Sequence, residues 1–230
     1  MQIYTHTLPG GAQLIGYLRD RTVEMPAFNT RPAILILPGG GYAWCSRREA
    51  DPVAMQFLQA GYNVFTLYYT CRSEETVPAL RWQPLIDAAG AILHIRRNAE
   101  QFGTDPAKIA ICGFSAGGHL ALSAAVLDIP GETAQQRPNA VILGYPVITA
   151  GEFAHRGSFV QLAGSATFIG LILTMVCCII LGMGVPTTAN YCIMASTCAP
   201  ILIKMGYPLV AAHFFVFYFG ICLLYTSDAA

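Results

Sequence analysis

The sequence predicts an α/β fold over residues 31–146, in which helices flank a mainly parallel sheet. Short apolar runs of strand length alternate there with longer segments whose apolar residues recur at helical spacing. The run at 33–37 is apolar throughout and ends in Pro38 and three glycines. Continuous apolar runs bounded by turn residues are typical of strands buried on both faces, as in a parallel sheet.

The expected elements follow one another in a regular order. A first hairpin ends at 13–18, and the alternation starts with the strand at 33–37. The elements that follow are a helix at 49–60 stopped by Gly61, a strand at 63–69, a helix at 83–102, a turn at 103–106, a strand at 108–112, a helix from 117 to 126 and a strand at 140–145. Strands that alternate with helices indicate βαβ units.

Charge and cysteine usage exclude several function classes. The 13 Lys and Arg residues balance the 13 Asp and Glu residues, and no basic block occurs, so we expect no nucleic-acid partner. The eight cysteines show no metal-ligand spacing, and we expect neither a metal nor a cofactor. The first residues lack a signal-peptide pattern, so reduced thiols and a cytoplasmic location are expected for residues 1–164.

Residues after 164 have a different composition. Only Lys204 and Asp228 are charged among residues 166–230. The uncharged run at 167–185 nearly spans a hydrocarbon core at about 1.5 Å per residue. Two further apolar runs follow at 191–203 and 209–224. These runs lack a polar face, so we expect membrane-type helices and membrane association through residues 167–221; the alternative is an unusually apolar soluble core.

The strongest chemical motif is Gly113-Phe114-Ser115-Ala116-Gly117, which follows a predicted strand and precedes a predicted helix. In this context Ser115 lies on a tight turn and acts as a nucleophile, and side chains at the flanking positions would clash with neighbouring backbone. The Ala116 amide then points toward the oxyanion that forms on attack. The alternative is a serine that merely starts a glycine-rich helix.

The stretches 36–42, 49–65, 84–121 and 140–159 together resemble the acetyl-esterase and acetylxylan-esterase-like (BD-FAE-like) branch of the α/β-hydrolases. The resemblance covers about residues 25–162. It implies a serine carboxylesterase for small acyl esters or acetylated sugars, with an acyl-enzyme at Ser115 and oxyanion donors at Gly40, Gly41 and Ala116. His119 matches the family pattern, and a packing and hydrogen-bonding role is expected for it.

The acid and histidine that activate such a serine are not recognisable. In α/β-hydrolases they follow the serine on loops after two later strands. Glu152 and His155 have the correct order, but they lie three residues apart on one loop. We therefore expect an α/β-hydrolase that stops before its catalytic half, is inactive, exposes a sheet edge and aggregates without detergent.

Residues 165–221 resemble the large membrane subunit of tripartite ATP-independent periplasmic (TRAP) transporters, most specifically at 182–190 (GMGVPTTAN). A fragment of such a dicarboxylate or organic-acid transporter is the alternative function. Residues 222–230 resemble translated adapter read-through. The expected organisation is a hydrolase part at 1–164, a transmembrane fragment at 165–221 and an artefactual tail, arising from a chimera or a natural fusion.

Overall fold

The structure, a computed structural model, describes most of the first 164 residues and short parts of the remainder. The described residues are 1–72, 79–127, 134–148, 154–164, 195–196, 198–203 and 208–221. The chain divides into two compact units, Met1–Ala163 and Gly164–Ala230. The boundaries expected from the sequence at 164 and 221 remain predictions.

The first unit contains a six-stranded sheet with the order β1-β2-β4-β3-β5-β6. β1 and β2 form the expected hairpin, and β2 pairs with β4 in the antiparallel sense. The pairs β3–β4, β3–β5 and β5–β6 are all parallel, which confirms the mainly parallel sheet. The strands are β1 Gln2–Thr7, β2 Gln13–Leu18, β3 Arg31–Leu37, β4 Asn63–Tyr68, β5 Thr104–Phe114 and β6 Ala140–Gly144.

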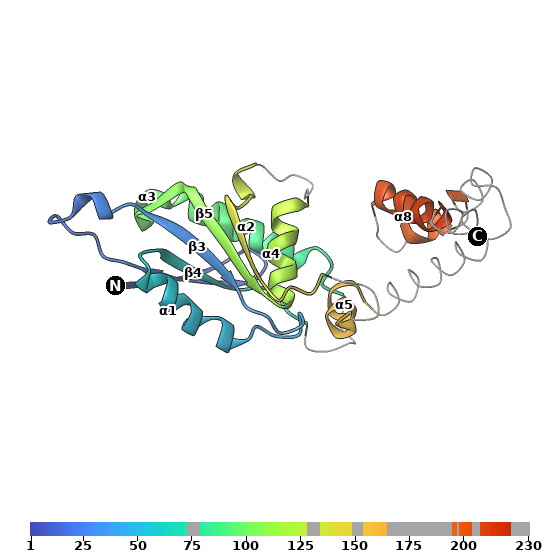
Figure 1. The fold of residues 1–230 in the computed structure, drawn as a ribbon, viewed down its shortest axis with the longest axis horizontal. Helices are drawn as coiled ribbons and strands as arrows, with labels where there is room; N and C mark the ends of the chain where they lie inside the picture. Colours follow the sequence, from blue (N-terminus) through green and yellow to red (C-terminus); the bar gives the residue numbers. More distant parts are fainter. Residues whose placement is uncertain are drawn as a thin grey trace, which may run out of the picture. The chain divides into compact units, whose positions relative to one another are not determined.

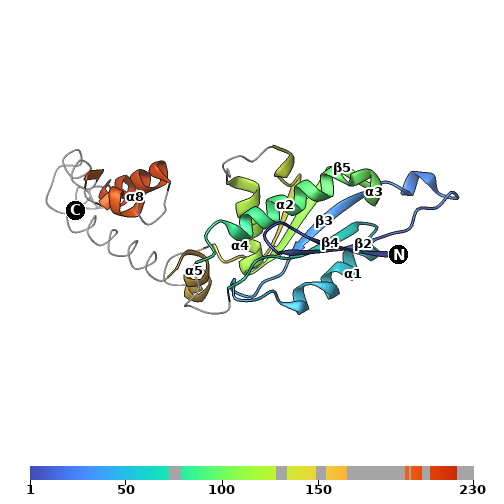
Figure 2. The same ribbon diagram turned by 180° about the vertical axis from the view of Figure 1, so that it is seen from behind.

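Helices cover both faces of this sheet. α2 (Gln83–Arg97), α3 (Ala99–Phe102) and α4 (Ala116–Val126) lie on one face, and α1 (Asp51–Gln59) lies on the other (Figures 1 and 2). α5 (Arg156–Ala163) follows β6, and its Gln161 and Leu162 carbonyls accept hydrogen bonds from the Leu80 and Arg81 amides. Short 3-10 turns are found at Pro26–Phe28, Arg47–Glu49 and Ala134–Gln136.

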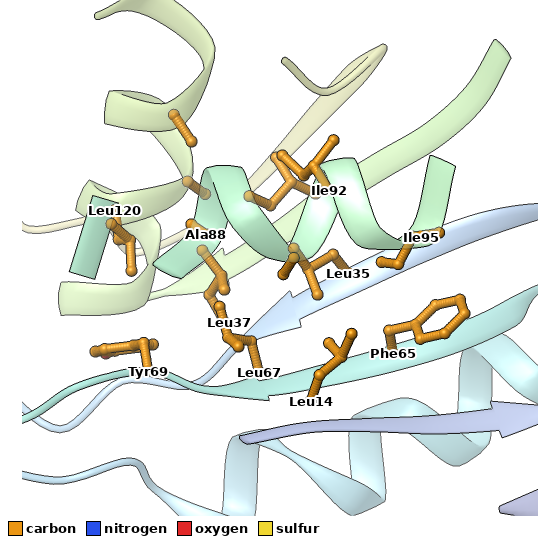
Figure 3. Packing of buried hydrophobic residues seen from close by; sticks show 14 of the residues in the cluster. Leu14, Leu35, Leu37, Phe65, Leu67, Tyr69, Ala88, Ile92, Ile95 and Leu120 are labelled. Atoms are coloured by element: carbon orange, nitrogen blue, oxygen red, sulfur yellow. The ribbon is translucent and has the colours of Figure 1, made fainter. Parts of the chain in front are cut away.

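The core explains why the third strand is apolar at every position. Residues 33–37 of β3 are all fully buried. Leu35 and Leu37 pack with Ile92 and other residues of the helices on the α2 and α4 face (Figure 3). Ile34 and Ile36 pack on the opposite face with residues of α1. The strand is therefore buried on both sides, as its sequence predicts.

Two sequence expectations around residue 100 are wrong. The helix expected at 83–102 is divided at Asn98, whose side-chain amide donates to the His94 carbonyl at 2.8 Å and so ends the first helix. The turn expected at 103–106 is confined to Gly103, which has a left-handed φ of 63°. β5 already begins at Thr104, which pairs with Arg31 before a register shift.

The sixth strand forms one edge of the sheet. Val141, Ile142 and Leu143 of β6 are 37%, 45% and 38% exposed. Within the described residues no strand pairs with the outer side of β6. The expected exposure of a sheet edge is therefore confirmed for this part of the chain.

The second unit contains α8 (Leu209–Ile221). The apolar run at 167–185 lies outside the described residues, as do residues 204–207 and 222–230. Among the helices that are described, none is long and apolar enough to cross a membrane. The structure thus gives no support to the membrane-type helices, which remain a prediction.

Candidate active site

Ser115 lies at the junction between β5 and α4, in a backbone conformation that side chains rarely adopt. Its φ is 52° and its ψ is −117°. Such a conformation persists only where surrounding contacts enforce it. The Ser115 amide donates to the Gly144 carbonyl at 2.9 Å, and its carbonyl accepts from the His119 and Val147 amides at 3.1 Å each. These bonds hold Ser115 on the strained turn between strand and helix that a nucleophile of this type needs.

The glycines on each side of Ser115 are required by close backbone packing. A Cβ atom on Gly113 would lie 2.0 Å from the Gly117 carbonyl oxygen. A Cβ atom on Gly117 would lie 2.2 Å from the Leu37 carbonyl oxygen of β3. Both distances are impossible for real atoms, which confirms the steric reason inferred for the motif.

The loop after β3 runs directly against the nucleophile. Gly40 and Gly41 have φ values of 133° and 66°. A Cβ atom on Gly40 would lie 2.0 Å from the Trp44 carbonyl oxygen, and one on Gly39 would lie 3.0 Å from the Ser115 Cβ. Glycine at these positions therefore allows the loop to approach Ser115 closely.

Three amide groups near Ser115 have N–H groups available for a ligand. Within the described residues, the Gly40 and Gly41 amides donate to no acceptor. Ala116 is the first residue of α4, where an amide has no intrahelical acceptor. The Gly39 amide, in contrast, donates to Glu49 Oε2 at 2.6 Å. Among the described residues, the predicted donors at Gly40, Gly41 and Ala116 therefore have no backbone acceptor.

Ser115, Gly40 and Gly41 line one pocket of about 370 Å³. Its size is within the range of small-molecule sites. The side chains that complete its wall come from the segment between β3 and α1, from the residue after β6, and from α5 and the residue before it. They include Trp44, Arg48, Glu49, Tyr145, His155 and Gln161.

Glu49 is a functional candidate that the sequence analysis missed. Besides the Gly39 amide, its carboxylate accepts the Tyr145 hydroxyl at 2.8 Å. Partial desolvation and this hydrogen bond raise the pKa of Tyr145. Glu49 thus connects the glycine loop to the segment after β6. Its position on a 3-10 turn, ten residues from Gly39, gave no periodic signal that could have indicated this contact.

His119 has the structural role expected from the sequence. Its Nδ1 lies 2.7 Å from the Tyr42 hydroxyl, and the two rings are arranged edge to face. Burial lowers the pKa of His119, so the neutral form is favoured. Among the described residues, no hydrogen bond joins the His119 ring to the Ser115 side chain.

His155 lies in the pocket but is not oriented as a catalytic base. Its Nδ1 accepts the Ser158 amide at 3.3 Å and lies 2.8 Å from the Ser158 hydroxyl. The ring therefore bonds to Ser158, and within the described residues no hydrogen bond joins His155 to Ser115. Ser115 Oγ has no hydrogen-bond partner among the described residues, and Glu152 lies outside them.

The central parallel sheet, the strained serine and the glycine loop together define an α/β-hydrolase with a nucleophile turn. The BD-FAE family model matches residues 23–141, and the chain belongs to that family. A second family model, the DctM component of tripartite ATP-independent periplasmic transporters, matches residues 138–226, less than half of the chain.

Curated relatives share the first unit. Endo-1,4-beta-xylanase B of Butyrivibrio fibrisolvens is 39% identical over an alignment of 164 residues that covers 66% of this chain and 24% of that protein. An acetylxylan esterase of Xylanibacter ruminicola is 30% identical over 158 residues, or 67% of this chain and 29% of that protein. The chain therefore spans 24% and 29% of the length of these two relatives.

Solved structures give the same fold. The acetyl ester-xyloside bifunctional hydrolase of Caldicellulosiruptor lactoaceticus has a TM-score of 0.56 and 33% identity, covering 69% of this chain and 57% of that one. A carboxylesterase of Lactobacillus plantarum WCFS1 has a TM-score of 0.61 and 27% identity, covering 73% and 65%. The first unit is thus a carboxylesterase- and acetylxylan-esterase-like α/β-hydrolase.

Proposed function

We propose that residues 1–163 form the nucleophile half of a serine carboxylesterase for small acetyl esters, including acetylated sugars. The observation that supports this most is the strained Ser115 beside the unpaired Gly40 and Gly41 amides in one pocket. The xylan-related names of the relatives support acetylated sugars as the substrate class. The exposed Trp44 and Tyr145 rings in the same pocket could contact the apolar faces of a sugar.

The reaction that this site would perform starts at Ser115. Its Oγ attacks the ester carbonyl, and the oxyanion that forms accepts hydrogen bonds from the Gly40, Gly41 and Ala116 amides. The alcohol leaves, an acetyl group remains on Ser115, and water then releases acetate. Both steps need a base that takes a proton from serine or water, and a histidine oriented by a carboxylate normally provides it.

The described part of the chain brings no such base to Ser115. His155 lines the same pocket as Ser115, and its Nδ1 bonds to Ser158. We therefore propose that this chain does not turn over esters. A general base contributes roughly 10²–10⁴-fold to such reactions, so without one we expect ester hydrolysis to be slower by about that factor.

Hydrolysis of p-nitrophenyl acetate tests this proposal. The full chain, purified in mild detergent, should release p-nitrophenol no faster than its Ser115→Ala variant. Turnover that disappears in Ser115→Ala would overturn the proposed inactivity. If that turnover also disappears in His155→Ala, His155 would be the base.

For the second unit, we propose a fragment related to the DctM transporter subunit. The family match at 138–226 and the near absence of charge after residue 165 support it. We expect membrane association through this unit. Alkaline carbonate washing of membranes that contain the chain tests this, because release into the supernatant would contradict it.

A further inference from the structure

The structure brings together two cysteines that are far apart in the sequence. Cys45 Sγ and Cys71 Sγ lie 3.6 Å apart, although 26 positions separate the residues. Both side chains are half-buried, so small reagents can reach them. Each sulfur also lies near the Tyr69 carbonyl, at 3.8 Å for Cys45 and 3.4 Å for Cys71. The sequence predicts only scattered thiols, because the spacing of the cysteines does not reveal this contact.

The pair connects the glycine loop to the segment that follows β4. Cys45 lies between Trp44 and Ser46, which both line the pocket of Ser115. The Ser46 amide donates to the Gly39 carbonyl at 2.8 Å, so Cys45 is one residue from a direct contact with the loop. On the other side, the amide of Arg72, next to Cys71, donates to the Tyr42 carbonyl at 2.8 Å.

We propose that Cys45 and Cys71 form a redox-active dithiol, which a low-molecular-weight disulfide such as oxidised glutathione converts to a disulfide bond. To form the bond, the sulfurs must approach from 3.6 Å to about 2.05 Å. The new bond would fix the loop that carries Gly40 and Gly41 against the 69–72 segment. The site is therefore a modification site next to the pocket and does not depend on ester hydrolysis.

The oxidation of the two thiols by oxidised glutathione takes place in two thiol–disulfide exchange steps. One cysteine thiolate attacks a sulfur of oxidised glutathione, forming a mixed disulfide and releasing one glutathione thiolate. The second thiolate then attacks the protein sulfur of that mixed disulfide, forms the Cys45–Cys71 bond and releases the second glutathione. The two protons of the cysteines pass to the released glutathione, and the two protein thiols are oxidised as the disulfide reagent is reduced.

Peptide mapping after oxidation tests the proposal. The reduced full chain in mild detergent is treated with oxidised glutathione, denatured, alkylated, digested and analysed by mass spectrometry. The expected result is a Cys45–Cys71 linked peptide as the main crosslink, with two of the eight cysteines lost to alkylation. Dithiothreitol should restore both sites.

Controls separate this pair from random oxidation. Cys112 is buried in β5, so its thiol should stay reduced during the oxidation and be alkylated once the chain is denatured. Cys112→Ser should therefore leave the Cys45–Cys71 crosslink unchanged. The same treatment in urea should distribute crosslinks over several pairs. Cys45 and Cys71 that stay separately alkylated, that keep glutathione without closing, or that pair with other cysteines as often as with each other would overturn the proposal.

Discussion

β3 and β6 have similar apolar sequences but opposite surroundings. Leu35 of β3 is fully buried between two helical layers, whereas Leu143 of β6 is 38% exposed at the edge of the sheet. The loop after β3 and the turn after β5 carry the glycines and the serine of the site. The acid and base of such enzymes follow later strands, and within the described residues the sheet ends at β6. The difference shows that the buried centre of the sheet supports the part of the site that is assembled, which is the glycine loop and the serine turn.

The largest expected effect comes from the packed turn around Ser115. Gly113→Ala places a Cβ atom 2.0 Å from the Gly117 carbonyl oxygen, so backbone must move. We expect a loss of more than about 4 kcal/mol in the free energy of unfolding, measured with urea in the full chain. The matched control is Gly90→Ala in α2, where the nearest atom is 3.9 Å away. That variant should gain up to about 1 kcal/mol because alanine favours the helix.

A pair of identical substitutions compares the two strands directly. Leu35→Ala should cost about 2–5 kcal/mol, because it leaves a cavity in a closely packed core. Leu143→Ala should cost about 1 kcal/mol or less, because much of that side chain already contacts solvent. Urea unfolding of both variants measures the difference. Equal losses would mean that another surface covers β6 in solution.

A smaller effect is expected from pH through His119. Burial lowers its pKa in the folded chain, so the unfolded chain binds the proton at a higher pH. The contribution of His119 to the free energy of unfolding is therefore fully present above its pKa in the unfolded chain, near 6.5. This contribution is lost as the pH falls toward the pKa of His119 in the folded chain. Urea unfolding at about pH 7.5 and about pH 5.5 measures this decrease.

The control for this pH effect is His119→Gln, which does not titrate and can still bond the Tyr42 hydroxyl. It should show a smaller decrease than the unchanged chain. Some decrease should remain, because burial and His6 also lower the pKa of His94. An unchanged pH dependence in His119→Gln would contradict the assignment to His119.

The smallest effect on stability is expected at the open edge. Ile142→Lys should change the free energy of unfolding by no more than about 0.5 kcal/mol, because Ile142 is 45% exposed. A charge on an edge strand should nevertheless reduce aggregation without detergent. Light scattering of dilute samples measures the aggregation. The contrasting position for the same lysine substitution is Thr66, which is buried in β4. Unchanged scattering in Ile142→Lys would indicate that β6 is not the aggregating surface.

The sequence predicts features that depend on local pattern. The strands, the parallel sheet, the turn at Ser115 and the steric role of Gly113 and Gly117 are encoded within a few residues of each position. Contacts across the fold are not encoded in this way. The Glu49 carboxylate on the Gly39 amide and the Cys45–Cys71 pair depend on how separate loops meet at the end of the sheet. Asn98 ends a helix through one side-chain bond that periodicity does not reveal.

The most direct test of a nucleophile assembled without a base is the acetylation of Ser115 with and without added imidazole. The full chain is treated with p-nitrophenyl acetate, and mass spectrometry locates acetyl groups, with Ser115→Ala as the control. Without imidazole, Ser115 should stay unmodified. With imidazole as an external base, Ser115 should be acetylated in preference to the other serines. Turnover at Ser115 without imidazole, or no preference for Ser115 with it, would contradict this description of the site.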